Sequence, residues 1–166
     1  MYRTISDFTL DWKYENGATL KVLHALTDES LHQKVTPDGR SLGFLAWHLV
    51  LTLSEMGSKM GLQITGPAED SEQPTSASEI ASTYDISAKS VAEVVRMTWS
   101  DASLEEKIEM YGATWKRGGA LASLVKHQTH HRAQMTVLMR QAGLPVPGVY
   151  GPSREEWAKM GIPPQK

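Results

Sequence analysis

Two histidines one helical turn apart carry the strongest chemical signal in this sequence. His127 and His131 lie within residues 119–141, a stretch that contains HQTHHRAQ. On a helix each residue advances by about 100°, which places both imidazoles in the middle of the apolar side of this stretch. Two buried imidazoles without partners would each cost roughly 1–3 kcal/mol. A metal ion is an economical shared partner, so the pair indicates a metal site.

A third histidine, His48, lies at the middle of the apolar side of a second predicted helix, residues 41–59. The residues predicted to share its inner face are Phe44, Leu45, Leu51 and Thr52. A single histidine in such a place is commonly a hydrogen-bonded core residue, but the 127/131 pair makes His48 a third candidate ligand. Three imidazoles with an open fourth position are typical of catalytic rather than structural zinc sites.

The identity of the metal is narrowed by the ligand types that the sequence offers. The chain has no cysteine, so thiolate ligands, disulfides and a cysteine nucleophile are all excluded. Imidazole suits several transition metals. We therefore expect a divalent metal ion, Zn or Ni first, bound by His48, His127 and His131.

Two residues, Gln128 and Glu55, indicate which reactions the site could perform. The His127/His131 spacing matches the H-E-x-x-H helix of metalloproteases, but Gln128 stands where that motif has its general base. An amide cannot accept a proton, which argues against metalloprotease chemistry. Glu55, two turns beyond His48 on the same face, is our candidate catalytic residue. It is a general base, an acid that supports a metal ligand, or a carboxylate that reaches solvent at the end of the bundle.

Three polar neighbours of the histidine pair receive other interpretations. His130 lies on the helix flank, about 100° from His131, and is not expected to be a ligand. Arg132 is expected in a salt bridge on the helix flank or in a contact between subunits. Gln134 either hydrogen-bonds the site or is an ordinary interior amide.

The segments that must position these residues are helical. Apolar residues recur at helical spacing in residues 5–26, 41–59, 77–99 and 119–141, and Ser76-x-x-Glu79 is a capping box. Residues 61–74 read as a long loop, a kind that often covers a site. Residues 101–117 read as a crossover with short extended pieces. We therefore expect an all-α fold, a four-helix bundle formed by one domain over residues 1–166.

The C-terminal segment is predicted to contain one further short helix. Prolines at positions 145, 147 and 152 exclude a helix there, and Ser153-x-x-Glu156 then caps a terminal helix. We expect this tail to pack back on the bundle, with Trp157 and Met160 as its anchors.

Length and charge exclude several classes of partner. The 166 residues carry a net charge of −2 and no basic block, which argues against nucleic acid. No apolar run approaches the roughly 20 residues that span a bilayer, and the N-terminus is not a signal peptide. We expect a cytoplasmic protein that acts on a small molecule.

The motifs LAWHLV, HQTHHRAQMTVLMRQAG and VPGVYGPSREEW together resemble the DinB family of DinB/YfiT-like metalloenzymes, over nearly the whole chain. The resemblance implies a four-helix bundle, often a homodimer, with a divalent metal held by three histidines. The motif positions fall on His48, His127 and His131. Ala133 departs from the glycine usual in the family's H-H-R-G-Q element, but this position is not a ligand.

The resemblance also suggests a class of reaction. The superfamily includes thiol-dependent enzymes such as bacillithiol S-transferases and mycothiol-dependent maleylpyruvate isomerase. It implies a metal-dependent enzyme, either an S-transferase that uses a low-molecular-weight thiol or a hydrolase. Two alternatives are a non-catalytic metal-binding dimeric bundle with a stress-response or ligand-binding role, and a bundle in which hydrogen bonds alone satisfy three core histidines.

Overall fold

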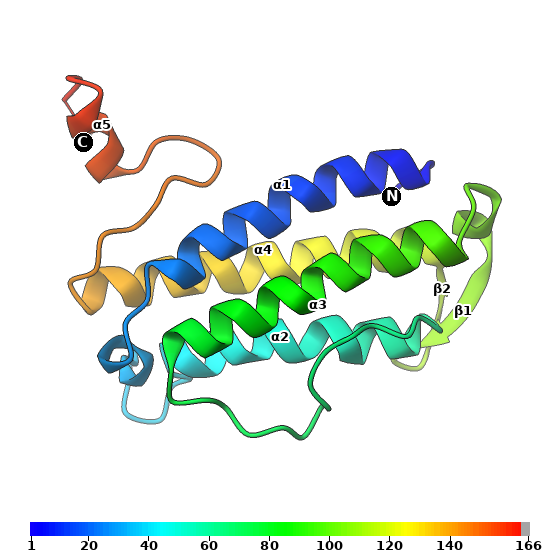
Figure 1. The fold of residues 1–166 in the computed structure, drawn as a ribbon, viewed down its shortest axis with the longest axis horizontal. Helices are drawn as coiled ribbons and strands as arrows, with labels where there is room; N and C mark the ends of the chain where they lie inside the picture. Colours follow the sequence, from blue (N-terminus) through cyan, green and yellow to red (C-terminus); the bar gives the residue numbers. More distant parts are fainter. Residues whose placement is uncertain (164–166) are drawn as a thin grey trace.

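Four long helices, packed side by side, make up most of the chain (Figure 1). The computed structural model describes residues 1–163. The four helices are α1 (Ile5–His24), α2 (Leu42–Lys59), α3 (Ala77–Thr98) and α4 (Arg117–Gln141). Helices α1 and α2 each pack against both α3 and α4, so the four enclose one apolar core. The mostly helical fold is confirmed, and each helix ends within two residues of its expected limits.

A small antiparallel sheet corrects the expectation of an all-α fold. Strands β1 (Lys107–Met110) and β2 (Ala113–Lys116) pair between α3 and α4. Their cross-strand pair Ile108–Trp115 joins a β-branched and an aromatic side chain, which favours a pleated surface. The short extended pieces expected in residues 101–117 are therefore present as one hairpin. Two 3₁₀ turns (Glu29–His32 and Ala102–Glu105) and the short helix α5 (Arg154–Lys159) complete the order of elements.

Hydroxyl caps fix where three of the long helices begin. The side chains of Thr4, Ser41 and Ser76 each accept a hydrogen bond from the backbone N–H three residues later. Helix α4 has no side-chain cap and begins directly after β2. Its first turn needs Gly118, because a Cβ there would lie 2.7 Å from the Tyr2 carbonyl oxygen. The hairpin and this close approach together set the position of α4.

The inner face of α2 is narrower than its sequence predicts. Leu45 and Thr52 are buried and Leu51 is half-buried, but Phe44 is 43% exposed and stacks against the His48 ring. His48 itself is half-buried because it lies at the edge of the core face rather than at its centre. The expected burial of Phe44 is wrong for this reason.

A buried ion pair ties α4 to α1. The Arg132 side chain donates to the Glu15 carboxylate (2.6 Å), to the Glu15 carbonyl oxygen (2.9 Å) and to the Thr19 hydroxyl (3.1 Å). Arg132 is 2% exposed and Glu15 is 5% exposed. The expected salt bridge of Arg132 is present, but it lies in the core instead of on the helix flank.

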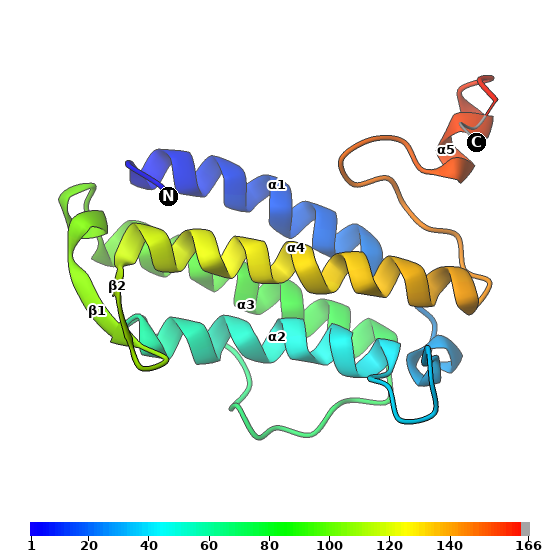
Figure 2. The ribbon, with the colours of Figure 1, turned by 180° about the vertical axis from the view of Figure 1, so that it is seen from behind.

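The C-terminal tail divides into a packed part and a projecting part. Val146 is buried, the Tyr150 hydroxyl donates to the Glu15 carboxylate (2.7 Å), and the Tyr150 ring stacks on Tyr14. Helix α5 stands away from the four long helices in both views (Figures 1 and 2). Trp157 is half-buried, but Met160 is 58% exposed and is not an anchor. The tail therefore packs through residues 144–150, since these contact α1 and the core.

No helix within residues 1–163 combines the length and the apolar character that crossing a bilayer would require.

Replacing Arg132 by Met should lower the free energy of unfolding by about 3–5 kcal/mol, because the Glu15 carboxylate would stay buried without its partner. Guanidinium unfolding curves measure this. The control is Arg140→Met, which breaks the exposed Arg140–Glu155 pair and should cost less than about 1 kcal/mol. Equal losses of unfolding free energy in the two variants would show that the buried pair contributes no more to stability than the exposed one.

Candidate metal centre

Three imidazoles from two helices converge at one point on the side of α4 that faces α2. His48 comes from α2, and His127 and His131 come from α4. One ligand nitrogen from each lies within 4.8 Å of the other two. The rings meet edge to face, with centroids 4.5–5.0 Å apart. The structure therefore brings together the three predicted metal ligands.

The spacing of one pair of nitrogens fits a tetrahedral ion. The Nε2 atoms of His48 and His127 are 3.2 Å apart. Two nitrogens bound tetrahedrally to zinc at about 2.0–2.1 Å would lie roughly 3.3 Å apart. The donor set of three imidazoles, with no thiolate, suits a divalent transition metal. The cluster is thus compatible with a divalent metal ion.

Burial keeps all three imidazoles neutral. Burial first, and then the neighbouring His131 and His48, lower the pKa of His127 to about 4. The pKa values of His48 and His131 are also lowered, mainly by burial. Only the neutral imidazole has a lone pair for a metal. The cluster is therefore in its ligating form at neutral pH.

Gln134 orients one of the three ligands. Its side-chain oxygen lies 2.7 Å from Nδ1 of His131. Because this oxygen only accepts hydrogen bonds, Nδ1 carries the proton and Nε2 keeps its lone pair for the cluster. Of the two roles open to Gln134, the structure shows the hydrogen bond to the site; the amide is exposed, not interior.

Gln128 and His130 lie outside the cluster. The buried Gln128 amide donates to the Leu49 carbonyl oxygen (3.2 Å) and accepts from the Tyr84 hydroxyl (3.1 Å), so it joins α4 to α2 and α3. His130 is exposed and does not belong to the group of three converging nitrogens. Gln128 is thus a core amide, and His130 is a surface residue of α4.

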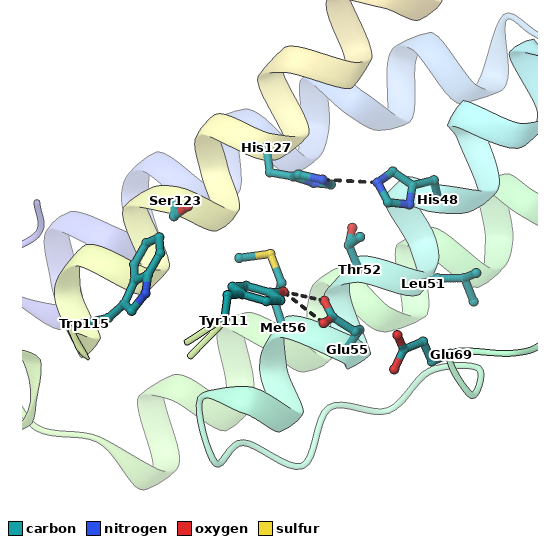
Figure 3. A pocket seen from close by; sticks show the side chains of 10 residues that line it. All are labelled: His48, Leu51, Thr52, Glu55, Met56, Glu69, Tyr111, Trp115, Ser123 and His127. Carbon is teal, nitrogen blue, oxygen red and sulfur yellow. Dashed lines mark hydrogen bonds between the residues drawn. The ribbon is translucent and has the colours of Figure 1, made fainter. Parts of the chain in front are cut away.

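A cavity of about 510 Å³ opens against His48 and His127 (Figure 3). Four parts of the chain form it: α2, the loop before α3, the hairpin and the first half of α4. Its other lining residues are Leu51, Thr52, Glu55, Met56, Glu69, Tyr111, Trp115 and Ser123. The long loop contributes only Glu69 to this lining. The cavity combines apolar walls with a few polar groups, as small-molecule sites commonly do.

Glu55 lies in this cavity, held by groups from two elements. Its carboxylate oxygens accept hydrogen bonds from the Tyr111 hydroxyl (2.7 and 2.9 Å), and Lys59 forms an ion pair with it at 3.4 Å. The sequence places Glu55 on the face of His48, and the structure confirms that both line one cavity. Sequence reasoning missed Tyr111: Gly112 marks a turn, but nothing in the sequence links the phenol to Glu55.

Tyr111 has an unusual backbone conformation. Its φ of +53° is the only positive φ of a non-glycine residue within 1–163, and Gly112 follows with φ +73°. Two such residues form the tight hairpin turn that normally takes Asn-Gly. For a tyrosine this conformation costs of the order of 1–3 kcal/mol.

Comparisons with known proteins agree with this architecture. The model of the DinB family matches residues 1–166. The uncharacterized protein YrdA of Bacillus subtilis (strain 168) is 45% identical over 162 residues, covering 98% of this chain and 97% of the relative. A DinB-like protein from Bacillus cereus ATCC 10987 has a crystal structure with a TM-score of 0.87 and 43% identity, covering 90% of this chain and all of the relative. The DinB-like protein YjoA of Bacillus subtilis shares the fold at 15% identity, with a TM-score of 0.65 and coverage of 82% and 92%.

Single alanine substitutions should separate ligands from neighbours. His48→Ala, His127→Ala and His131→Ala should each lose most of the bound divalent metal, because each removes one of three donors. His130→Ala, the matched control on the same helix, should keep it. Elemental analysis of purified, untagged protein measures the metal per chain. Equal loss from His130→Ala and His131→Ala would overturn the ligand assignment.

The metal-free protein should lose stability as the pH falls from about 6.5 to about 4. The unfolded chain protonates its histidines near pH 6.5, whereas the pKa of folded His127 is about 4. In this window the unfolded state binds more protons, so stability rises with pH and falls on acidification. Thermal unfolding in chelator at several pH values tests this, with His127→Ala showing a flatter profile. The same dependence of melting temperature on pH in both proteins would contradict the lowered pKa assigned to His127.

Proposed function

This chain belongs to the DinB family, and from that premise we propose that it is a four-helix-bundle metalloenzyme acting on a small molecule. His48, His127 and His131 hold its divalent ion, Zn or Ni. The observation that carries the proposal is the convergence of three neutral imidazoles, two of which line a cavity that also contains a carboxylate. A purely structural site would be closed by a fourth protein ligand.

The reaction that this site supports best is the transfer of a low-molecular-weight thiol to an electrophile. A bound divalent ion would supply Lewis-acid chemistry that lowers the pKa of a thiol or water at the open position. Glu55 takes the proton when the S–H bond breaks, at a carboxylate oxygen. The sulfur then forms a bond to an electrophilic carbon, and the leaving group departs with its electron pair. With water in place of the thiol, the same groups perform a hydrolysis.

The cavity residues favour this chemistry in two ways. The side chains of Leu51, Met56 and Trp115 give one reactant apolar surface and limit its contact with water. Glu55 is half-buried, yet it stays within the cavity through its contacts with Tyr111 and Lys59. A general base must be held within reach of the proton that it removes.

Glu55→Gln should lower the rate of thiol consumption about a hundredfold while the metal content stays unchanged. The assay uses zinc-loaded protein, 2-mercaptoethanol as the thiol and 1-chloro-2,4-dinitrobenzene as the electrophile. Glu93→Gln, which changes an exposed carboxylate on α3, is the control and should leave the rate unchanged.

Two results would argue against this function. An unchanged rate in Glu55→Gln would remove the proposed base. If the metal-loaded protein consumes no thiol with any electrophile, the transferase role fails, and a metal-binding protein without this activity is the better description.

A further inference from the structure

We propose that Tyr111 is a positioning residue that holds the Glu55 carboxylate in the cavity beside the histidine cluster. The inference rests on the proposed function, because it concerns the residue assigned there as the base. Tyr111 comes from the hairpin turn and Glu55 from α2 (Figure 3). The hairpin thereby becomes a part of the site, although it contributes none of the three histidines.

The contacts show how Glu55 is held. The Tyr111 hydroxyl reaches both carboxylate oxygens, at 2.7 and 2.9 Å. Lys59, one turn along α2, pairs with the same carboxylate at 3.4 Å and lies over the Tyr111 ring, 5.3 Å from its centre. Without the phenol, Lys59 would be the partner left to the Glu55 carboxylate. Its positive charge would draw the carboxylate along the helix towards solvent. Tyr111 is thus the contact that keeps Glu55 facing the cavity.

The backbone of Tyr111 argues against a role in stability alone. Its φ of +53° suits asparagine or glycine far better than tyrosine. Its side chain is 56% exposed, so apolar burial does not explain why a tyrosine occupies the turn. Strained backbone of this kind is commonly retained at functional sites. What the tyrosine adds, and asparagine could not, is a phenol long enough to reach α2.

The phenol stays a hydrogen-bond donor under all ordinary conditions. Although most of the residue is exposed, its hydroxyl is partly desolvated against Glu55. This desolvation and the Glu55 carboxylate both raise the pKa of Tyr111 well above its usual value. A neutral phenol donates to an ionised carboxylate, which is the form that a base needs. The pair therefore keeps Glu55 oriented without competing with it for protons.

The test separates positioning from stability in cobalt-loaded protein. The rate at which 2-mercaptoethanol produces the thiolate-to-cobalt absorption is measured by stopped flow across the pH range, alongside the melting temperature. Tyr111→Phe should slow this rate about tenfold, the usual worth of one hydrogen bond to a charged group. Tyr111→Asn should slow it similarly, yet melt at the same or a higher temperature because the turn strain is relieved. Tyr14→Phe, which removes a hydroxyl bonded to the Val149 carbonyl oxygen away from the cavity, should leave the rate unchanged.

A double mutant shows whether Tyr111 acts through Glu55. The Tyr111→Phe/Glu55→Gln protein should be no slower than Glu55→Gln alone, because the two side chains act as one unit. Additive effects, an unaffected rate in Tyr111→Phe, or a rate loss in Tyr111→Asn that comes with a lower melting temperature would each overturn the inference.

Failure of the proposed function gives a different result. In that case wild-type protein binds cobalt but never develops the thiolate absorption, whatever the variants do. Crystal structures of wild type and Tyr111→Phe then decide the inference by themselves. A Glu55 carboxylate that turns away from the cavity in the variant supports positioning by Tyr111, and one that stays in place overturns it.

Discussion

The buried ion pair between Arg132 and Glu15 is the interaction on which the placement of the converging histidines of α4 depends. Removing two charges from water is unfavourable. The attraction between them offsets this only when further hydrogen bonds form, as they do where the guanidinium also donates to a carbonyl and a hydroxyl of α1. Arg132 directly follows His131. Once the arginine faces α1, the rotation of α4 about its own axis is fixed, and His127 and His131 must face α2. Tyr150 of the tail completes this arrangement by donating to the same carboxylate.

A second buried polar side chain on α4, one turn before Arg132 on the same face, fixes the distance of α4 from α2. Gln128 joins the Leu49 carbonyl oxygen to the Tyr84 hydroxyl, and these bonds are buried, so leaving them unmade would be costly. The histidines therefore meet between two helices whose relative position is set by buried polar contacts. The low pKa values of the imidazoles follow from the same enclosure, because burial and mutual proximity both disfavour their charged forms. Preorganisation of neutral donors is what a metal with an open position requires.

Much of the fold and the cluster could be predicted because both follow from local periodicity. The 3.6-residue repeat defines a helix face, and a histidine on that face can be placed from its neighbours alone. The contacts that were missed join residues far apart in the sequence: Glu15 and Arg132 are separated by 117 positions, and Glu55 and Tyr111 by 56. No periodic pattern records such pairs. Phe44 and Met160 were misplaced for a related reason, since hydrophobicity alone does not show whether a neighbouring element covers a side chain.

Helix α4 assigns its residues to different partners within two turns. His127 and His131 face the cluster, Gln128 and Arg132 face the core, and Gln134 supports His131 from outside. Insertion of one residue between the histidines would rotate everything beyond it by about 100°. His131 would then leave the histidine cluster, and Arg132 would at the same time leave the core. Substitutions can be compensated singly, but a change of length here cannot. Evolution of this protein should therefore vary the length of its 61–74 loop and tail, and preserve the spacing within α4.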